Sequence, residues 1–154
     1  MQKITTFLWF DTQAEEAAHY YVSVFGGDSE VLDATQYTEA APDRVGTVMS
    51  VRFRLAGQEY VALNGGPQFP FTEAVSLYVD CDSQEETDAL WAELTKDGEE
   101  GQCGWLKDKY GLSWQLVPRG FTEVMSDPDP AKVLRAVKAM MGMRKLDLEA
   151  LRNA

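Results

Sequence analysis

The chain has 154 residues, of which 14 are basic and 25 are acidic, so its formal net charge is −11. A hydrophobic content of 45%, with 11% aromatic residues, is enough for a folded core and excludes a disordered chain. Phosphate backbones and anionic lipids attract proteins rich in Lys and Arg, so we expect no nucleic-acid partner and no membrane association. The apolar stretches are far shorter than a bilayer span. Cys81 and Cys103 have no metal-ligand spacing, which favours a reduced, cytoplasmic protein.

The sequence contains the same module twice. One shift along the chain pairs Asp11 with Asp82 and Gly27 with Gly98. Each copy begins with alternating apolar residues and continues through an Asp-Thr or Asp-Ser pair that can cap a helix. An amphipathic helical pattern then follows. The repeat therefore predicts two related strand–helix modules in one chain.

In each module the helix is followed by further strands. We predict helices over residues 12–25 and 83–96. Alternating patterns joined by turn residues predict strands, which cover residues 31–37, 45–55, 59–64, 104–107 and 112–117. The prediction is an α+β fold of two βαβββ modules in a domain at residues 1–120. Module one lies at about 3–65 and module two at about 73–118.

A helical extension is predicted at residues 121–154. Its main helix begins at Pro130, because proline is favoured at the first helical position. Lys132, Arg135 and Lys138 lie on one side of this helix. A basic face on an acidic chain indicates docking within the chain or between subunits.

Three long strings connect the chain to a known family. FLWFDTQAEEAAHYYVSVF, VALNGGPQFPF and GEEGQCGWLKDKYGLSWQLVP resemble the vicinal-oxygen-chelate superfamily of glyoxalase-like and bleomycin-resistance-like proteins, in particular its PhnB-like subgroup. The resemblance implies a glyoxalase-like fold with curved mixed sheets, and a homodimer. The subgroup often carries the label 3-demethylubiquinone-9 3-methyltransferase. We do not expect that activity, because the first strand enters its helix through Asp11, Thr12 and Gln13 without the Gly-rich loop that nucleotide-type cofactors need.

The resemblance also indicates where a metal would bind. Metal-dependent members take two ligands from each module, typically His or Gln from the first strand and Glu from the last. The matching positions are Ile4 or Thr6, Ala62, Ala74 or Ser76, and Gln115. Ile and Ala donate no lone pair, and hydroxyls are poor neutral ligands. Since the single amide of Gln115 cannot hold a transition metal, we predict no metal site and no cofactor.

Strand alternation gives the candidate binding residues. We expect the fully apolar face of each strand to pack under the helices, and the mixed face to line the concave side where members of the superfamily bind ligands. The candidates are Tyr60, Asn64, Ser76, Tyr78, Ser113 and Gln115, with Trp105 at the mouth of the cavity. The alternative is an interior filled by hydrogen-bonded side chains. We predict no catalytic residue, and His19 is interpreted as a helix residue without a catalytic role.

The sequence therefore favours a cytoplasmic, metal-free dimer that binds an unidentified small polar or aromatic molecule. One alternative is a metal-dependent lyase or isomerase of the same superfamily. Another is a structural or partner-binding dimer with a packed interior. Metal content separates the enzyme from the other two functions, and ligand-dependent changes in melting temperature separate the binder from the structural dimer.

Overall fold

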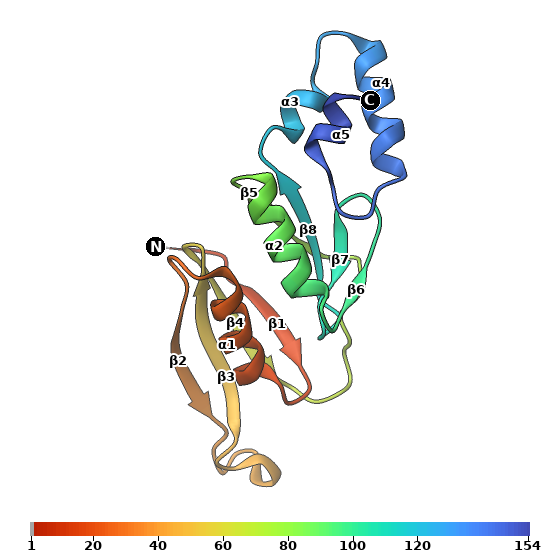
Figure 1. Cartoon of the computed structure of the whole chain (residues 1–154). Coiled ribbons are helices and arrows are strands. Elements are labelled where there is room, and N and C mark those ends of the chain that lie inside the picture. Colours follow the sequence, from red (N-terminus) through yellow and green to blue (C-terminus); the bar gives the residue numbers. More distant parts are fainter. Residues whose placement is uncertain (1) are drawn as a thin grey trace. The chain divides into compact units, whose positions relative to one another are not determined.

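The computed structural model describes residues 2–154, which form two compact units: the first ends at Pro70 and the second begins at Phe71. Each unit contains one four-stranded mixed sheet and one long helix packed on it (Figure 1). The element order is βαβββ in both units, apart from a 3-10 turn in the first and three helices at the end of the second. The predicted α+β fold of two βαβββ modules is confirmed.

The first unit is built around the sheet order β1-β4-β3-β2, in which β1 runs parallel to β4 and the other pairs are antiparallel. Its elements are β1 Thr6–Phe10, α1 Ala14–Phe25, β2 Glu30–Gln36, the 3-10 turn Pro42–Arg44, β3 Val48–Leu55 and β4 Gln58–Asn64. Helix α1 covers one face of this sheet. Tyr21 of α1 stacks on Phe53 of β3 with ring centroids 6.3 Å apart, and both side chains are fully buried.

The start of α1 differs from the predicted Asp-Thr cap. The residue before the helix is Gln13, whose side chain makes no capping hydrogen bond. Instead, the backbone N–H of Ala14 donates to Oδ1 of Asn64, 2.8 Å away at the end of β4. The first turn of a helix has unpaired N–H groups that need an acceptor. Here a residue distant in sequence supplies it, and the same contact fixes α1 against β4.

The second unit repeats the arrangement with the sheet order β5-β8-β7-β6. Its core elements are β5 Ser76–Cys81, α2 Gln84–Thr95, β6 Glu99–Glu100, β7 Trp105–Lys107 and β8 Ser113–Pro118. Strand β6 was not predicted. The predicted cap of α2 is confirmed, because Oγ of Ser83 accepts from the backbone N–H of Glu86 at 3.0 Å.

The turn between β7 and β8 is held by one buried carboxylate. Asp108 is 3% exposed and accepts the backbone N–H of Tyr110 at 2.9 Å and that of Leu112 at 3.1 Å. Its second oxygen accepts the indole N–H of Trp114 at 2.9 Å. A buried charge is tolerated when hydrogen bonds satisfy it. Asp108 therefore fixes both the turn and the Trp114 ring beneath the sheet.

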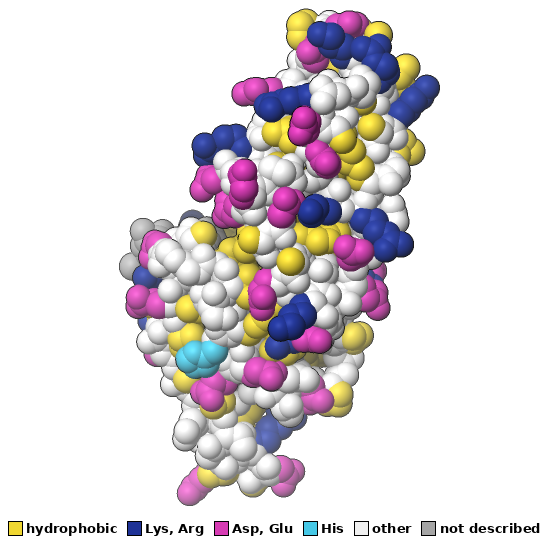
Figure 2. All heavy atoms as spheres, viewed as in Figure 1, with side chains coloured by type: hydrophobic (Ala, Val, Ile, Leu, Met, Phe, Trp, Pro, Cys, Tyr) yellow, Lys and Arg dark blue, Asp and Glu magenta, His cyan; other side chains and the backbone are white. Residues whose placement is uncertain are grey.

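Three helices end the chain and belong to the second unit: α3 Phe121–Met125, α4 Pro130–Met141 and α5 Leu148–Arg152. Pro130 begins α4, as predicted. Lys and Arg side chains gather over the region of these helices, whereas many Asp and Glu side chains lie on the rest of the visible surface (Figure 2). Within residues 2–154, every helix is too short or too polar to cross a bilayer.

Candidate functional site

Five of the predicted binding residues share the face of the second sheet that α2 does not cover. On the opposite face, Leu106, Trp114 and Leu116 are buried, and Cys81 interacts with Thr87 of α2. The strand register then places Ser76 beside Ser113, and Tyr78 beside Gln115, on the uncovered face. Trp105 pairs with Gln115 and lies on this face as well. The strand alternation of the second module was therefore interpreted correctly.

A cavity of about 350 Å³ opens on this face. Trp105 and Ser113 border it, together with Lys107, which pairs with Ser113 across β7 and β8. Three glutamates, Glu73, Glu99 and Glu100, complete its charged rim. We call this cavity the Trp105 pocket. It combines an aromatic surface with a few polar groups, which is the usual character of a small-molecule site.

Ser113 is the unusual group in the Trp105 pocket. The residue is 1% exposed, and its hydroxyl has no hydrogen-bond partner among the described residues. Most buried side-chain polar atoms are paired, because a buried donor without a partner loses its hydration without compensation. A hydroxyl that borders a cavity and is left unpaired is therefore a candidate to bind a polar atom of a ligand.

Ser76 and Gln115 satisfy each other instead. The side-chain amide of Gln115 donates to Oγ of Ser76 at 2.9 Å. Tyr78 is 51% exposed, and burial of its remaining surface raises the pKa of its hydroxyl. These three residues share the uncovered face with the Trp105 pocket but do not border the cavity. The structure thus brings Trp105 and Ser113 together in one pocket and leaves Ser76, Tyr78 and Gln115 beside it.

The charged rim of the pocket is organised in pairs. Lys107 forms an ion pair with Glu73, and the hydrogen bond between them lowers the pKa of Glu73 and raises that of Lys107. Glu100 accepts from the indole N–H of Trp91 at 2.7 Å and from Arg144 at 3.2 Å. The Trp91 hydrogen bond, followed by that of Arg144, lowers the pKa of Glu100. These rim residues were not predicted from the sequence. Lys107 could have been, because it lies two residues after Trp105 in the same strand and therefore on the same face.

The two candidates of the first unit lie on the wrong face of their sheet. Tyr60 stacks on Phe53 with ring centroids 5.6 Å apart, and Phe53 stacks on Tyr21 of α1. Asn64 bonds the first turn of α1. Both side chains therefore lie on the side covered by the helix and not on the predicted open side. The prediction was wrong because the residue between them is Ala62, whose small, fully buried side chain lets α1 approach this face. The larger side chains of Val61 and Leu63 point to the other face.

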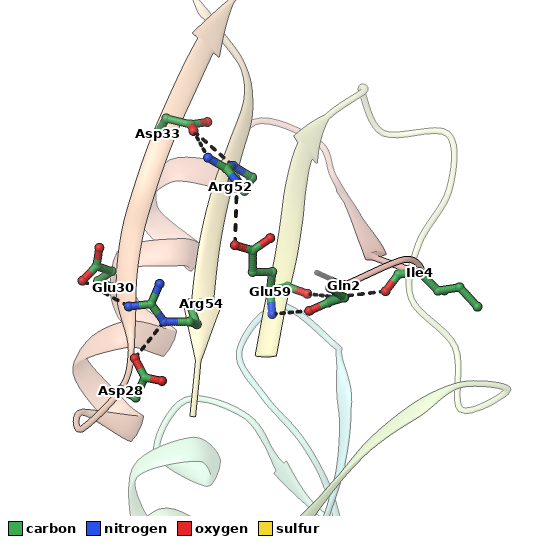
Figure 3. Close-up of polar contacts among 8 residues, drawn as sticks. All are labelled: Gln2, Ile4, Asp28, Glu30, Asp33, Arg52, Arg54 and Glu59. Atoms are coloured by element: carbon green, nitrogen blue, oxygen red, sulfur yellow. Dashed lines mark hydrogen bonds and ion pairs between the residues drawn. The ribbon is translucent and has the colours of Figure 1, made fainter. Parts of the chain in front are cut away.

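The open face of the first sheet carries ion pairs. Arg52 bonds Asp33 at 2.6 Å and lies 3.7 Å from Glu59 (Figure 3). Arg54 bonds Asp28 at 2.8 Å and lies 3.3 Å from Glu30. Since these charged groups bind one another, they offer less to a ligand than the unpaired hydroxyl of Ser113.

On the same face of the sheet, Trp9 is fixed by the segment that follows β4. Its indole N–H donates to the carbonyl of Gly66 at 2.9 Å, and its ring meets Phe69 edge-on at 5.0 Å. A Cβ at Gly65 would lie only 2.2 Å from the Trp9 ring. Gly65 is thus required by the packing of Trp9.

A second cavity of about 510 Å³ lies at one end of the first sheet, between the start of α1 and the segment joining β2 to β3. Asn64 borders it, but the oxygen and nitrogen of its side chain bond Ala14 and Val48. Arg44 lies over the Tyr37 ring and donates to its hydroxyl at 3.0 Å. The carboxylates that border this cavity belong to exposed residues. It is larger than the Trp105 pocket, but it contains no buried unpaired group.

Residues 2–117 match the family described as 3-demethylubiquinone-9 3-methyltransferase. The chain belongs to this family. Among solved structures, the PhnB protein from Bacillus cereus is 42% identical, with a TM-score of 0.69 over 76% of this chain and 99% of that one. The match supports the PhnB-like assignment within the vicinal-oxygen-chelate superfamily that the sequence strings indicated.

More distant structures show the fold of this family alone. Protein PA1353 from Pseudomonas aeruginosa is 19% identical, with a TM-score of 0.60 over 77% of this chain and 98% of that one. The fosfomycin resistance protein FosX from Listeria monocytogenes is 13% identical, with a TM-score of 0.55 over 80% and 98% of the two chains. A search of curated proteins finds no match.

The positions that correspond to metal ligands in the superfamily do not form a donor set here. Ala62 and Thr6 lie on the side covered by α1, and Ile4 and Ala74 precede their strands. The open face beside them carries Phe7 and Trp9 in β1 and Val61 and Leu63 in β4.

In the second sheet the corresponding side chains are Ser76 and Gln115, which bond each other. Within residues 2–154, no three His, Cys, Asp or Glu side chains gather as metal ligands.

Proposed function

We propose that this protein binds a small organic molecule in the Trp105 pocket. The observation that carries the proposal is the buried hydroxyl of Ser113, which has no partner among the described residues and borders the cavity. Leaving such a group unpaired costs about 1–3 kcal/mol. A ligand atom that bonds this hydroxyl would recover that free energy.

The lining of the pocket defines the kind of molecule. The indole of Trp105 offers a flat apolar surface, which favours an aromatic or planar group. The Ser113 hydroxyl can donate or accept, so the ligand carries one polar atom that reaches it. The Lys107–Glu73 ion pair at the rim is neutral as a pair. The pocket therefore suits a small, flat molecule with one hydrogen-bonding group.

We also propose that binding needs no metal and that the protein performs no methyl transfer. The residues at the superfamily's ligand positions offer a hydroxyl and an amide that bond each other, and neutral oxygen donors of this kind hold transition metals poorly. The two sheets are mixed, with a single parallel pair in each. Neither sheet has the Gly-rich turn between strand and helix that holds a nucleotide-type cofactor.

A cytoplasmic homodimer completes the proposal. Within its own unit, each of β1 and β5 is an edge strand, and Phe7 in β1 is 62% exposed. Edge strands with exposed apolar side chains favour association with another chain. Analytical ultracentrifugation of the full chain tests this part. A species of one chain mass at micromolar concentration would contradict the dimer.

Binding of the neutral, flat dye Nile red tests the ligand site. We expect the full chain to bind the dye with enhanced dye emission, and the Trp105→Ala variant to bind it at least about tenfold more weakly, because the aromatic surface is lost. Phe69→Ala is the matched control, since Phe69 is an exposed aromatic residue of the first unit. Equal binding by wild type and Trp105→Ala, or no binding by the wild type, would contradict the proposal.

A further inference from the structure

We propose that the segment from Met143 to Leu148, the C-terminal segment, holds the wall of the Trp105 pocket in place. This segment runs from the end of α4 into α5, and Arg144 is its positioning residue. This inference rests on the proposed function. The wall in question is the loop from Glu100 to Trp105, which joins β6 to β7 and contributes Glu100, Gly101 and Gln102 to the pocket.

Two backbone hydrogen bonds attach this loop to the C-terminal segment. The N–H of Cys103 donates to the carbonyl of Met143 at 2.9 Å, and the N–H of Gly104 donates to that of Arg144 at 2.7 Å. The loop bonds itself through the N–H of Gly101, which donates to the carbonyl of Trp105 at 2.8 Å. The residue that carries the pocket's indole is therefore only one peptide bond away from a residue fixed by the C-terminal segment.

Side chains add a second attachment at the same place. Arg144 donates to Glu100 at 3.2 Å, and the other carboxylate oxygen of Glu100 accepts from Trp91 of α2 at 2.7 Å. Glu100 is thus held between α2 and the C-terminal segment, directly at the rim of the pocket. An exposed ion pair adds little stability by itself. The Arg144–Glu100 pair instead holds the Glu100 carboxylate in one orientation at the rim of the pocket.

The C-terminal segment is itself fixed to the body of the second unit. The amide of Gln84 donates to the carbonyl of Leu146 at 2.9 Å and accepts from the N–H of Leu148 at 2.9 Å. Leu146 is 1% exposed and packs so closely on Gly104 that a Cβ there would lie 3.0 Å from its side chain. The segment is therefore bonded to Gln84 at the start of α2 and packed on Gly104 of the loop, so its position determines that of the loop.

The C-terminal segment lies beyond the residues that the family model matches, which end at residue 117. Its contacts with the pocket wall would give this chain a pocket shape that the matched residues alone do not determine.

The experiment compares three full-length variants. Arg144→Met removes the bond to Glu100, and Arg144→Lys keeps a cation at that position. Lys145→Met is the matched control, because Lys145 pairs with Asp88 at 2.8 Å and acts on Glu100 only through its charge, whereas Arg144 bonds Glu100 directly. Two readouts are used: the Kd for Nile red, and hydrogen–deuterium exchange of the backbone amides of residues 100–105.

We expect Arg144→Met to weaken Nile red binding by about threefold to tenfold and to speed exchange in residues 100–105. Arg144→Lys should recover part of the affinity, and Lys145→Met should leave both readouts at the wild-type level. Wild-type behaviour of Arg144→Met in both readouts would overturn the inference, as would an equal effect of Lys145→Met. If the wild type binds no Nile red, the proposed function fails, whereas the exchange data still decide whether Arg144 positions the loop.

Discussion

Gln115 donates from its side-chain amide to Oγ of Ser76 at 2.9 Å, across the parallel pair β5 and β8. Ser113 lies beside Ser76 in the same register, yet its hydroxyl has no partner among the described residues. Two neighbouring serines on one face thus differ in their hydrogen bonding. The hydroxyl of Ser76 bonds within the sheet, and we propose that the hydroxyl of Ser113 binds a molecule in the Trp105 pocket.

Substituting the two serines separates these roles. We expect Ser76→Ala to lower the free energy of unfolding by about 0.5–1.5 kcal/mol, because the amide of Gln115 loses its acceptor. Ser113→Ala should leave the free energy of unfolding unchanged or raise it by up to about 1–3 kcal/mol, because no hydrogen bond within the chain is broken and an unpaired buried hydroxyl is removed, and it should weaken Nile red binding. Urea unfolding and dye titration measure both effects. A larger loss of stability in Ser113→Ala than in Ser76→Ala would show that the hydroxyl has a structural partner.

Asp108 should be among the most sensitive residues of the second unit. Asp108→Ala leaves the N–H groups of Tyr110, Leu112 and Trp114 without their acceptor. We expect a loss of about 3 kcal/mol or more in the free energy of unfolding, measured by urea denaturation. Asp97→Ala is the control, because Asp97 is exposed. Similar midpoints for the two variants would refute the role of Asp108.

Gly104 and Gly111 offer a matched pair in the second unit. Both have positive φ, 86° and 85°, so alanine at either position costs about 1 kcal/mol of backbone strain. A Cβ at Gly104 also meets the side chain of Leu146 at 3.0 Å, whereas the space at Gly111 is open. We therefore expect Gly104→Ala to lower the melting temperature more than Gly111→Ala. Equal shifts would mean that Leu146 does not pack on the loop as described.

The Glu73–Lys107 pair gives a pH dependence of known sign. The folded-state pKa of Glu73 lies below its ordinary value of 4.5, so its contribution to stability is present above pH 4.5 and is lost as the pH falls through the lowered pKa. Glu73→Gln should therefore have a lower urea midpoint than the wild type at pH 7, and the difference should be smaller at pH 3. The effect is small, because the pair is exposed to solvent. Glu39→Gln, at an exposed residue of the first unit, should show no difference at either pH.

The two cysteines should react at different rates. Cys81 is 1% exposed, and burial raises the pKa of its thiol, so little thiolate is present at neutral pH. Cys103 is partly exposed. Titration of the native protein with a disulfide reagent should show one fast thiol, which is lost in Cys103→Ser and kept in Cys81→Ala. A fast thiol that survives in Cys103→Ser would contradict the burial of Cys81.

Periodicity predicted the architecture because each element has its own local signal. The repeat, the amphipathic helices and the alternating strands all follow from neighbouring residues, and the second-module face with Ser76, Ser113 and Gln115 follows from alternation. Strand β6 was not predicted because it is only two residues long and consists of Glu99 and Glu100, which have no strand pattern.

Contacts between distant residues could not be predicted from local patterns. Asn64 serves as the cap of α1 from the far end of β4, which turns its side chain toward the helix. Tyr60 lies on the same face as Asn64, because every second residue of a strand points to the same side of the sheet. The rule that the apolar face lies under the helix failed in β4, where the small Ala62 lies beneath α1 and Val61 and Leu63 lie on the open side. In the same way, Arg144 reaches Glu100 only through the folded position of the C-terminal segment.

Ligand binding in the Trp105 pocket is tested most directly by a crystal structure of the full chain soaked with a library of small aromatic compounds. We predict a compound in the Trp105 pocket, with its ring against Trp105 and a polar atom within about 3 Å of Oγ of Ser113. A pocket filled by protein side chains, or compounds bound elsewhere while this cavity stays empty, would contradict it.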